Sequence, residues 1–234
     1  MSQARAGRPR PGAAAATSPA GRSPAGRYGL LLLVLLASYV LSAFNGQRLG
    51  TNLQVGLFVT VLLLALRTSR LPRGPTMLCG ALALLGSAAA IWAEVTGTQA
   101  GAGAAQLWKG IILLAAVVLI VRRVLAMPTV TIQSIYGALS AYIIIGLMFA
   151  AFYAAIGLLG GASFFAAHQP ASLQNYQYFS FSTLTTLGYG DFTAASEGGR
   201  AAAVMEALTG QVFLVTLVAR LVSAFRAPAE RSGE

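Results

Sequence analysis

Residues 178–191 read YFSFSTLTTLGYGD, an aromatic and threonine-rich stretch that ends in two glycines, one on each side of a tyrosine, and an aspartate. The stretch lies between two long apolar segments, Val130–Leu159 and Ala201–Phe225. A membrane-spanning helix needs about 20 apolar residues, so the connection is too short to cross a bilayer and return as two helices. Irregular backbone survives at membrane depth only where protein buries it or where it lines a water-filled path. The sequence therefore predicts a re-entrant loop, a half-helix followed by an extended return segment.

The half-helix has readable ends. Pro170 and Ser172 form an N-terminal signal, with Ser172 as the expected N-cap. The segment Leu173–Thr185 contains neither glycine nor proline, so the helix is expected to continue to just before Gly188. The negative end of its dipole favours a cation near the membrane centre.

The residues that follow resemble a known signature. The run TTLGYGD at residues 185–191 resembles the filter motif of potassium channels, usually Thr-Val-Gly-Tyr-Gly-Asp, and residues 178–185 resemble the pore helix of that family. Leucine replaces the common valine, as it does in some bacterial and two-pore-type members. The resemblance implies a selectivity filter made of five residues: Thr186, Leu187, Gly188, Tyr189 and Gly190.

Potassium-channel chemistry explains these residue types. Carbonyl oxygens of residues 186–189 are expected to replace the water shell of K⁺, the only ligand implied, and no cofactor is expected. Turning successive carbonyls inward requires positive φ values, which Gly188 and Gly190 adopt cheaply. Asp191 is expected at the outer mouth, where carboxylates attract cations. One loop supplies a quarter of a ring, which predicts a homotetramer.

Two further groups of residues are candidates around the filter. Tyr178 and Phe179 are expected to brace Tyr189, and the predicted filter supports are Tyr178, Phe179, Ser182, Thr185 and Glu206. The last apolar segment resembles the inner helix of a bacterial potassium-channel group. Its gating or cavity candidates are Gly210, Gln211, Leu214 and Val218. Gly210 fits either a hinge or a close helix contact.

Composition independently indicates a membrane protein. The 234 residues are 56% hydrophobic and 9% charged, with a formal net charge of +10. Six apolar stretches approach the length of a span: Tyr28–Phe44, Thr51–Leu66, Thr76–Ala93, Leu107–Val121, Val130–Leu159 and Ala201–Phe225. Basic and non-basic loops alternate through six crossings, which predicts both termini in the cytoplasm of a cell (inner or plasma) membrane. The expected fold is all-α, with six transmembrane helices plus the re-entrant pore helix and filter loop.

The expected organisation has four parts. Residues 1–27 form a disordered basic tail, 28–125 a four-helix scaffold that resembles a voltage-sensor domain, 126–225 the pore domain, and 226–234 a short tail. The fourth apolar stretch lacks the arginine at every third position that voltage sensing requires. We therefore expect no steep voltage dependence, and the four helices serve as a scaffold or a site for lipids.

Other functions fit less well. The arginines lie at segment ends rather than along one polar face, which argues against nucleic-acid binding. No catalytic constellation is present in the apolar segments, so the protein is not expected to be an enzyme. A less selective cation channel of the same fold and a potassium transporter subunit remain as alternatives. Composition suggests a bacterial source, and the sequence leaves the gating stimulus and any regulatory partner open.

Overall fold

The computed structural model describes residues 27–44, 97–127 and 129–225, together with isolated helical positions between 85 and 95. The helices are α1 (Arg27–Phe44), α4 (Gln99–Leu125), α5 (Ile132–Leu159), the short 3₁₀ turn η2 (Ala166–His168), α6 (Leu173–Leu184) and α7 (Glu197–Phe225). No strand is assigned within these ranges, apart from one isolated antiparallel bridge. The described part is therefore all-helical, as the sequence predicted.

Three of the described helices are long and apolar enough to cross a membrane: Gln99–Leu125, Ile132–Leu159 and Glu197–Ser223. The fourth predicted span was wrong in its length, because α4 begins eight residues before Leu107. Thr98 caps this helix by accepting a hydrogen bond from the Gly101 amide at 3.2 Å. The first turns of α4 are rich in alanine, which has high helix propensity. They were left out of the predicted span because they are less hydrophobic than the residues that follow.

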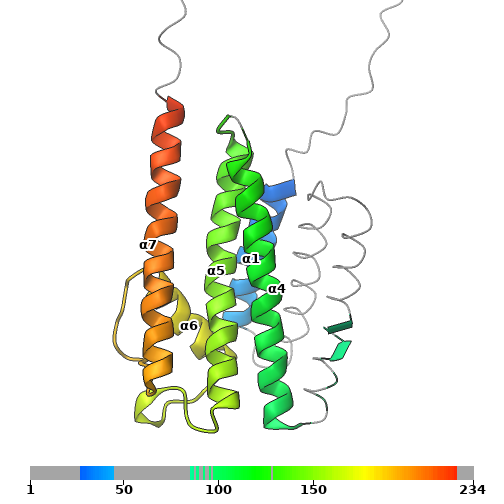
Figure 1. Ribbon diagram of the computed structural model, residues 1–234, viewed down its shortest axis with the longest axis vertical. Coiled ribbons are helices and arrows are strands. Elements are labelled where there is room, and N and C mark those ends of the chain that lie inside the picture. The colour runs from blue at the N-terminus through cyan, green and yellow to red at the C-terminus, as the bar shows by residue number, and fades with distance from the viewer. Residues whose placement is uncertain are drawn as a thin grey trace, which may run out of the picture.

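The central helix of the described fold is α5. Figure 1 shows α4 and α7 on either side of it, with α1 nearby and the short α6 near the end where the chain passes from α5 to α7. α5 begins with a capping box, in which Thr131 and Ser134 each accept a hydrogen bond from the other's amide. Its buried side chains face α1 and α4 on one side, and α6 and α7 on another.

Small residues bring α4 close to α5. A Cβ added at Gly110 would lie 2.3 Å from a ring carbon of Phe152, and one added at Gly103 would lie 2.7 Å from Leu159. These glycines therefore accept large side chains of α5 directly against the backbone of α4, as small residues do between membrane helices. The two helices form a tightly packed pair beside the site.

Several predictions lie outside the described residues. These are the span Thr51–Leu66, the span Thr76–Ala93 apart from its isolated described positions, the tail 1–26 and the tail 226–234. The first predicted span matches α1 in position, but its segment Tyr28–Ala37 counts as a shorter apolar helix and not as one of the three candidate spans among the described residues. The sixth coincides with α7, which starts four residues earlier than expected.

Candidate functional site

The half-helix is α6, and its predicted N-cap is confirmed. The Ser172 hydroxyl accepts a hydrogen bond from the Asn175 amide at 3.2 Å, and Thr185 is the C-cap. The Asn175 side chain adds a 2.7 Å hydrogen bond to the Pro170 carbonyl. Local capping therefore fixes where the half-helix begins, close to the position that the sequence indicated.

The chain leaves α6 in a compact turn that is anchored to the helix end. The amides of Leu187 and Gly188 both donate to the Ser182 carbonyl, at 2.9 and 3.2 Å, and the Thr186 amide donates to Thr183 at 3.0 Å. Ser182 thus supports the following segment through its carbonyl oxygen. These bonds use the amides of the segment and leave its carbonyl groups for other partners.

The backbone of this segment alternates in hand. Thr186, Gly188 and Gly190 have φ values of 60°, 55° and 81°, whereas Leu187 and Tyr189 between them are not in the left-handed region. Alternation of this kind gathers amides on one side of the backbone. The sequence predicted positive φ at both glycines. It missed Thr186, because threonine rarely adopts this conformation.

All seven residues from Thr185 to Asp191 are exposed in the single chain. Tyr189 is 68% exposed, yet its ring lies parallel to that of Tyr178 with centroids 6.5 Å apart. Tyr178 also meets Phe192 edge-on at 5.7 Å. Desolvation, followed by a hydrogen bond to Asp191, raises the pKa of Tyr178. Tyr178 therefore stacks on Tyr189 from α6 and braces it.

The structure gives Phe179 a different place from the one expected. Its ring packs on Tyr153 at a centroid distance of 5.0 Å and on Phe165 at 5.7 Å, on the side of α6 that faces α5. Among the described residues, the ring of Tyr189 stacks on Tyr178 and not on Phe179. The reason is helical geometry: adjacent residues of α6 point about 100° apart, so Tyr178 and Phe179 cannot face the same neighbour.

Phe179 belongs to an aromatic cluster that sequence reasoning did not find. Its members are Tyr153, Phe164, Phe165, Tyr176 and Phe179, all buried. Phe164 and Phe165 lie in the loop before α6. Main-chain bonds of 2.9 Å, from Ala166 to Thr193 and from Ala195 to Phe164, hold this loop against the segment after the glycines. The cluster thus fixes both ends of the re-entrant loop on α5.

Glu206 of α7 lies in the protein interior with no exposed surface. Its two carboxyl oxygens are each 2.5 Å from a hydroxyl, that of Tyr153 on α5 and that of Ser180 on α6. The Ser180 hydroxyl is also 2.6 Å from the Gly146 carbonyl. One side chain therefore joins three helices behind the half-helix. Neither partner stood out in the sequence, where they lie 53 and 26 residues from Glu206.

Gly210 lies directly against the end of α6. A Cβ added there would be 2.5 Å from the Leu184 carbonyl oxygen and 2.9 Å from the Leu184 side chain. α7 continues as one helix through this position. The Leu184 carbonyl also accepts a 3.2 Å hydrogen bond from Tyr142. This geometry shows that close helix packing requires a glycine at position 210, whether or not the helix bends there.

The remaining candidates lie at the surface of the single chain. Thr185 donates its hydroxyl to the Phe181 carbonyl at 2.7 Å, and Thr186 donates its own to the Thr185 carbonyl. Gln211, Leu214 and Val218 are exposed on α7. Among the described residues, no group of three His, Cys, Asp or Glu side chains is placed to hold a metal ion.

Part of the chain matches a known protein family. Residues 152–227, from the second half of α5 to just beyond α7, match a family model described as ion channel. Neither the curated proteins nor the solved structures gave a match. The matched range contains α6, the alternating segment and α7, and together with the apolar helices it supports a membrane-spanning ion-channel subunit.

Proposed function

We propose that the ion-channel segment at residues 152–227 makes this chain one subunit of a homotetrameric, potassium-selective channel that conducts K⁺ passively. The observation that carries the proposal is the alternating backbone of residues 186–190, exposed at the end of a half-helix. Four such segments around one axis would present carbonyl rings in place of a hydration shell. In this proposal residues Thr186, Leu187, Gly188 and Tyr189 coordinate K⁺, and Asp191 lies at the outer mouth.

The coverage of α7 supports a multi-chain assembly. Within its most apolar window, 11% of the residues are buried, compared with 56% for α5. Its large exposed side chains include Val204, Leu208, Val212, Val215 and Val222. Apolar surface of this extent is expected to meet other protein or lipid. In a tetramer whose four α7 helices surround one axis, neighbouring chains would cover part of this apolar surface. Gln211, Leu214 and Val218 would then line the cavity of the pore.

The topology completes the proposal. The chain would cross a cell membrane six times with both termini in the cytoplasm, and the first four helices would surround the pore as a scaffold. The charge pattern of α4 supports the proposal that the channel lacks steep voltage dependence. Its basic residues are Lys109, Arg122 and Arg123, and twelve uncharged residues separate the first two. A voltage sensor needs several charges within the membrane field.

Ion flux from liposomes tests the proposal directly. The purified chain, reconstituted in liposomes, is expected to pass K⁺ and to exclude Na⁺. Equal flux of the two ions would favour the less selective channel. Flux that saturates and requires a coupled ion gradient would favour a transporter subunit. A particle mass other than four chains would contradict the tetramer.

Two glycines provide a matched pair of variants. A Cβ meets nothing within 4 Å at either Gly188 or Gly198, but only Gly188 has a positive φ. Gly188→Ala is therefore expected to abolish selective flux through backbone strain. Gly198→Ala is expected to conduct as the wild type does. Normal K⁺ selectivity in Gly188→Ala would contradict the assignment of the filter.

A further inference from the structure

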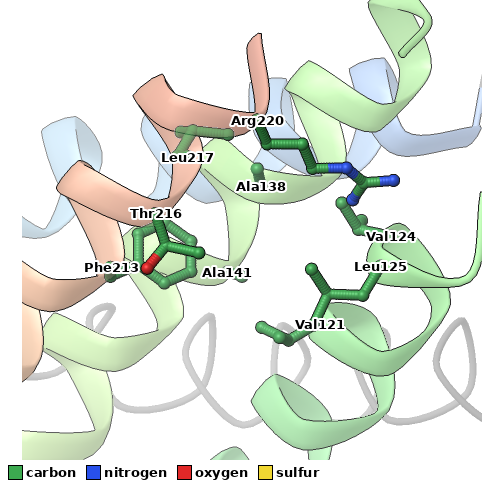
Figure 2. A pocket seen from close by; sticks show the side chains of 9 residues that line it. All are labelled: Val121, Val124, Leu125, Ala138, Ala141, Phe213, Thr216, Leu217 and Arg220. Carbon is green, nitrogen blue, oxygen red and sulfur yellow. The ribbon is translucent and has the colours of Figure 1, made fainter. Parts of the chain in front are cut away.

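An apolar groove lies between α4, α5 and α7, at the end of the molecule away from the re-entrant loop. Figure 2 shows its lining, with Val121 and Val124 from α4, Ala138 from α5, and Phe213 and Leu217 from α7. It contains about 440 Å³ of empty space, including its open side. Thr216 and Arg220 are the polar residues of the lining, and the rest of the surface is hydrocarbon.

Arg220 brings a positive charge to this apolar groove. One guanidinium nitrogen, Nη2, donates to the Met127 carbonyl at 2.8 Å. The other terminal nitrogen, Nη1, is buried and has no hydrogen-bond partner in the described part of the protein. A buried donor without an acceptor is costly, more so when it is charged. Arg220 therefore has an unused donor beside the groove (Figure 2).

No described carboxylate lies close enough in the fold to neutralise Arg220. The acidic residues of the described part are Asp191, Glu197 and Glu206. The nearest of these along α7, Glu206, is fourteen residues away, or about 21 Å at 1.5 Å per residue. Arg122 and Arg123 in the last turn of α4 add charge of the same sign at this end. The region therefore attracts anions.

We propose that this groove binds an anionic phospholipid, with an acyl chain between α4 and α7 and its phosphate on Arg220. The apolar lining favours an occupant with a hydrocarbon chain, and the positive charge of Arg220 in that lining favours a negatively charged group at the end of the chain. A phosphate matches the fork of a guanidinium. Basic sites between membrane helices at the cytoplasmic side recognise anionic headgroups through the same charge.

The position of the groove gives the lipid a regulatory role, which rests on the proposed channel function. Phe213, Thr216, Leu217 and Arg220 all follow Gly210 on α7, on the half that would form the cytoplasmic entrance of the pore. A lipid seated there would contact α4, α5 and α7 together. It would bias α7 toward the position seen in this structure, because a ligand shifts an equilibrium toward the state it binds better.

Lipid retention tests the binding without any measurement of conduction. The full chain is purified from membranes and exchanged into nanodiscs of phosphatidylcholine with graded phosphatidylglycerol, and the lipid retained is counted by native mass spectrometry. We expect the wild type to retain phosphatidylglycerol preferentially. Arg220→Gln is expected to lower that preference about tenfold, the size expected for one lost charge-assisted hydrogen bond.

Two further variants separate the parts of the site. Arg200→Gln is the matched control, because Arg200 is on the same helix and donates to a main-chain carbonyl, that of Ala194 at 3.1 Å. It is expected to retain the wild-type preference. Thr216→Phe, at an exposed position of the lining, is expected to reduce retention of both lipids. This second variant keeps the test decisive if Arg220→Gln fails to assemble.

Three results would overturn the proposal. The first is equal retention of the two lipids by the wild type, and the second is unchanged preference in Arg220→Gln. The third is displacement of phosphatidylglycerol by free inorganic phosphate, which would show an anion site without a lipid chain. Flux measured on the same samples distinguishes the lipid site from the channel function. A chain that prefers phosphatidylglycerol but shows no selective K⁺ flux would contradict the proposed channel and leave the lipid site standing.

Discussion

The Tyr153 hydroxyl lies 2.5 Å from a carboxyl oxygen of Glu206, and both side chains have no exposed surface. Ser180 meets the other carboxyl oxygen, and the Gly146 carbonyl lies beyond it. The Ser180 hydroxyl has one proton for two short contacts. All three contacts are satisfied at once if the group at position 206 accepts from Tyr153 and donates to Ser180, which then donates to Gly146.

This arrangement predicts different outcomes for two substitutions of Glu206. Glu206→Gln is expected to assemble normally, because an amide accepts through its oxygen and donates through its nitrogen. Glu206→Ala leaves the buried Tyr153 hydroxyl without its partner, at a cost of about 1–3 kcal/mol for an unsatisfied group, while the Ser180 hydroxyl keeps the Gly146 carbonyl. Thermal unfolding in detergent is expected to show a large loss for alanine and a small one for glutamine. Equal losses would mean that the hydrogen bonds are unimportant.

Removal of the Tyr153 hydroxyl isolates one bond of this set. Tyr153→Phe retains the ring contacts with Phe164 and Phe179, whose centroids lie 5.2 and 5.0 Å away. The expected loss is about 0.5–1.5 kcal/mol, the net value of one typical hydrogen bond, measured by thermal unfolding. In the Glu206→Ala background the same change is expected to cost less, since the bond is already gone. Strict additivity would contradict the link between the two residues.

Gly210→Ala tests the packing of α7 on the half-helix. A Cβ there would overlap the Leu184 carbonyl at 2.5 Å, and overpacking of this kind costs about 1–3 kcal/mol. We expect lower thermal stability together with altered flux, because Leu184 directly precedes the turn into residues 186–190, the proposed filter. Gly198→Ala, where a Cβ meets nothing, is the control. Unchanged stability with reduced opening would instead favour a role as a hinge alone.

Asp191→Asn tests the exposed carboxylate that follows the second glycine. The variant is expected to lower unitary K⁺ conductance at low salt, because the negative charge concentrates cations at the mouth. The difference should shrink in high salt, as the Debye length falls from about 30 Å at 0.01 M to about 3 Å at 1 M. Single-channel recording at both salt concentrations provides its own control. A loss that is independent of salt would indicate a structural role through Tyr178.

Conductance measured against voltage in symmetric K⁺ is expected to show no steep transition. Lys109→Gln should leave the curve unchanged, since one lysine within α4 is fewer than the several charges that steep voltage sensing needs. Several gating charges per subunit would contradict the assignment of the first four helices as a scaffold.

The sequence predicted the elements whose signals are local. Ser172 caps α6, α5 begins within two residues of the expected Val130, and Gly188 and Gly190 both have positive φ. A cap depends on a side chain three residues from its partner, and a glycine's φ depends on its missing Cβ. Such features need no knowledge of the rest of the chain. The start of α4 was missed because its first turns, rich in alanine and glycine, are less hydrophobic than the rest of the helix.

The amino-acid sequence alone determined the half-helix, its glycine-containing exit and the long apolar helices around it, because these follow from neighbours within one or two turns. The tertiary structure alone decided that Phe179 turns away from Tyr189, that Glu206 meets Tyr153 and Ser180, and that Arg220 reaches Met127, 93 residues earlier in the chain. The physical reason is that such contacts depend on how the helices rotate and cross. Packing of many side chains sets those rotations together, and no single local pattern encodes them.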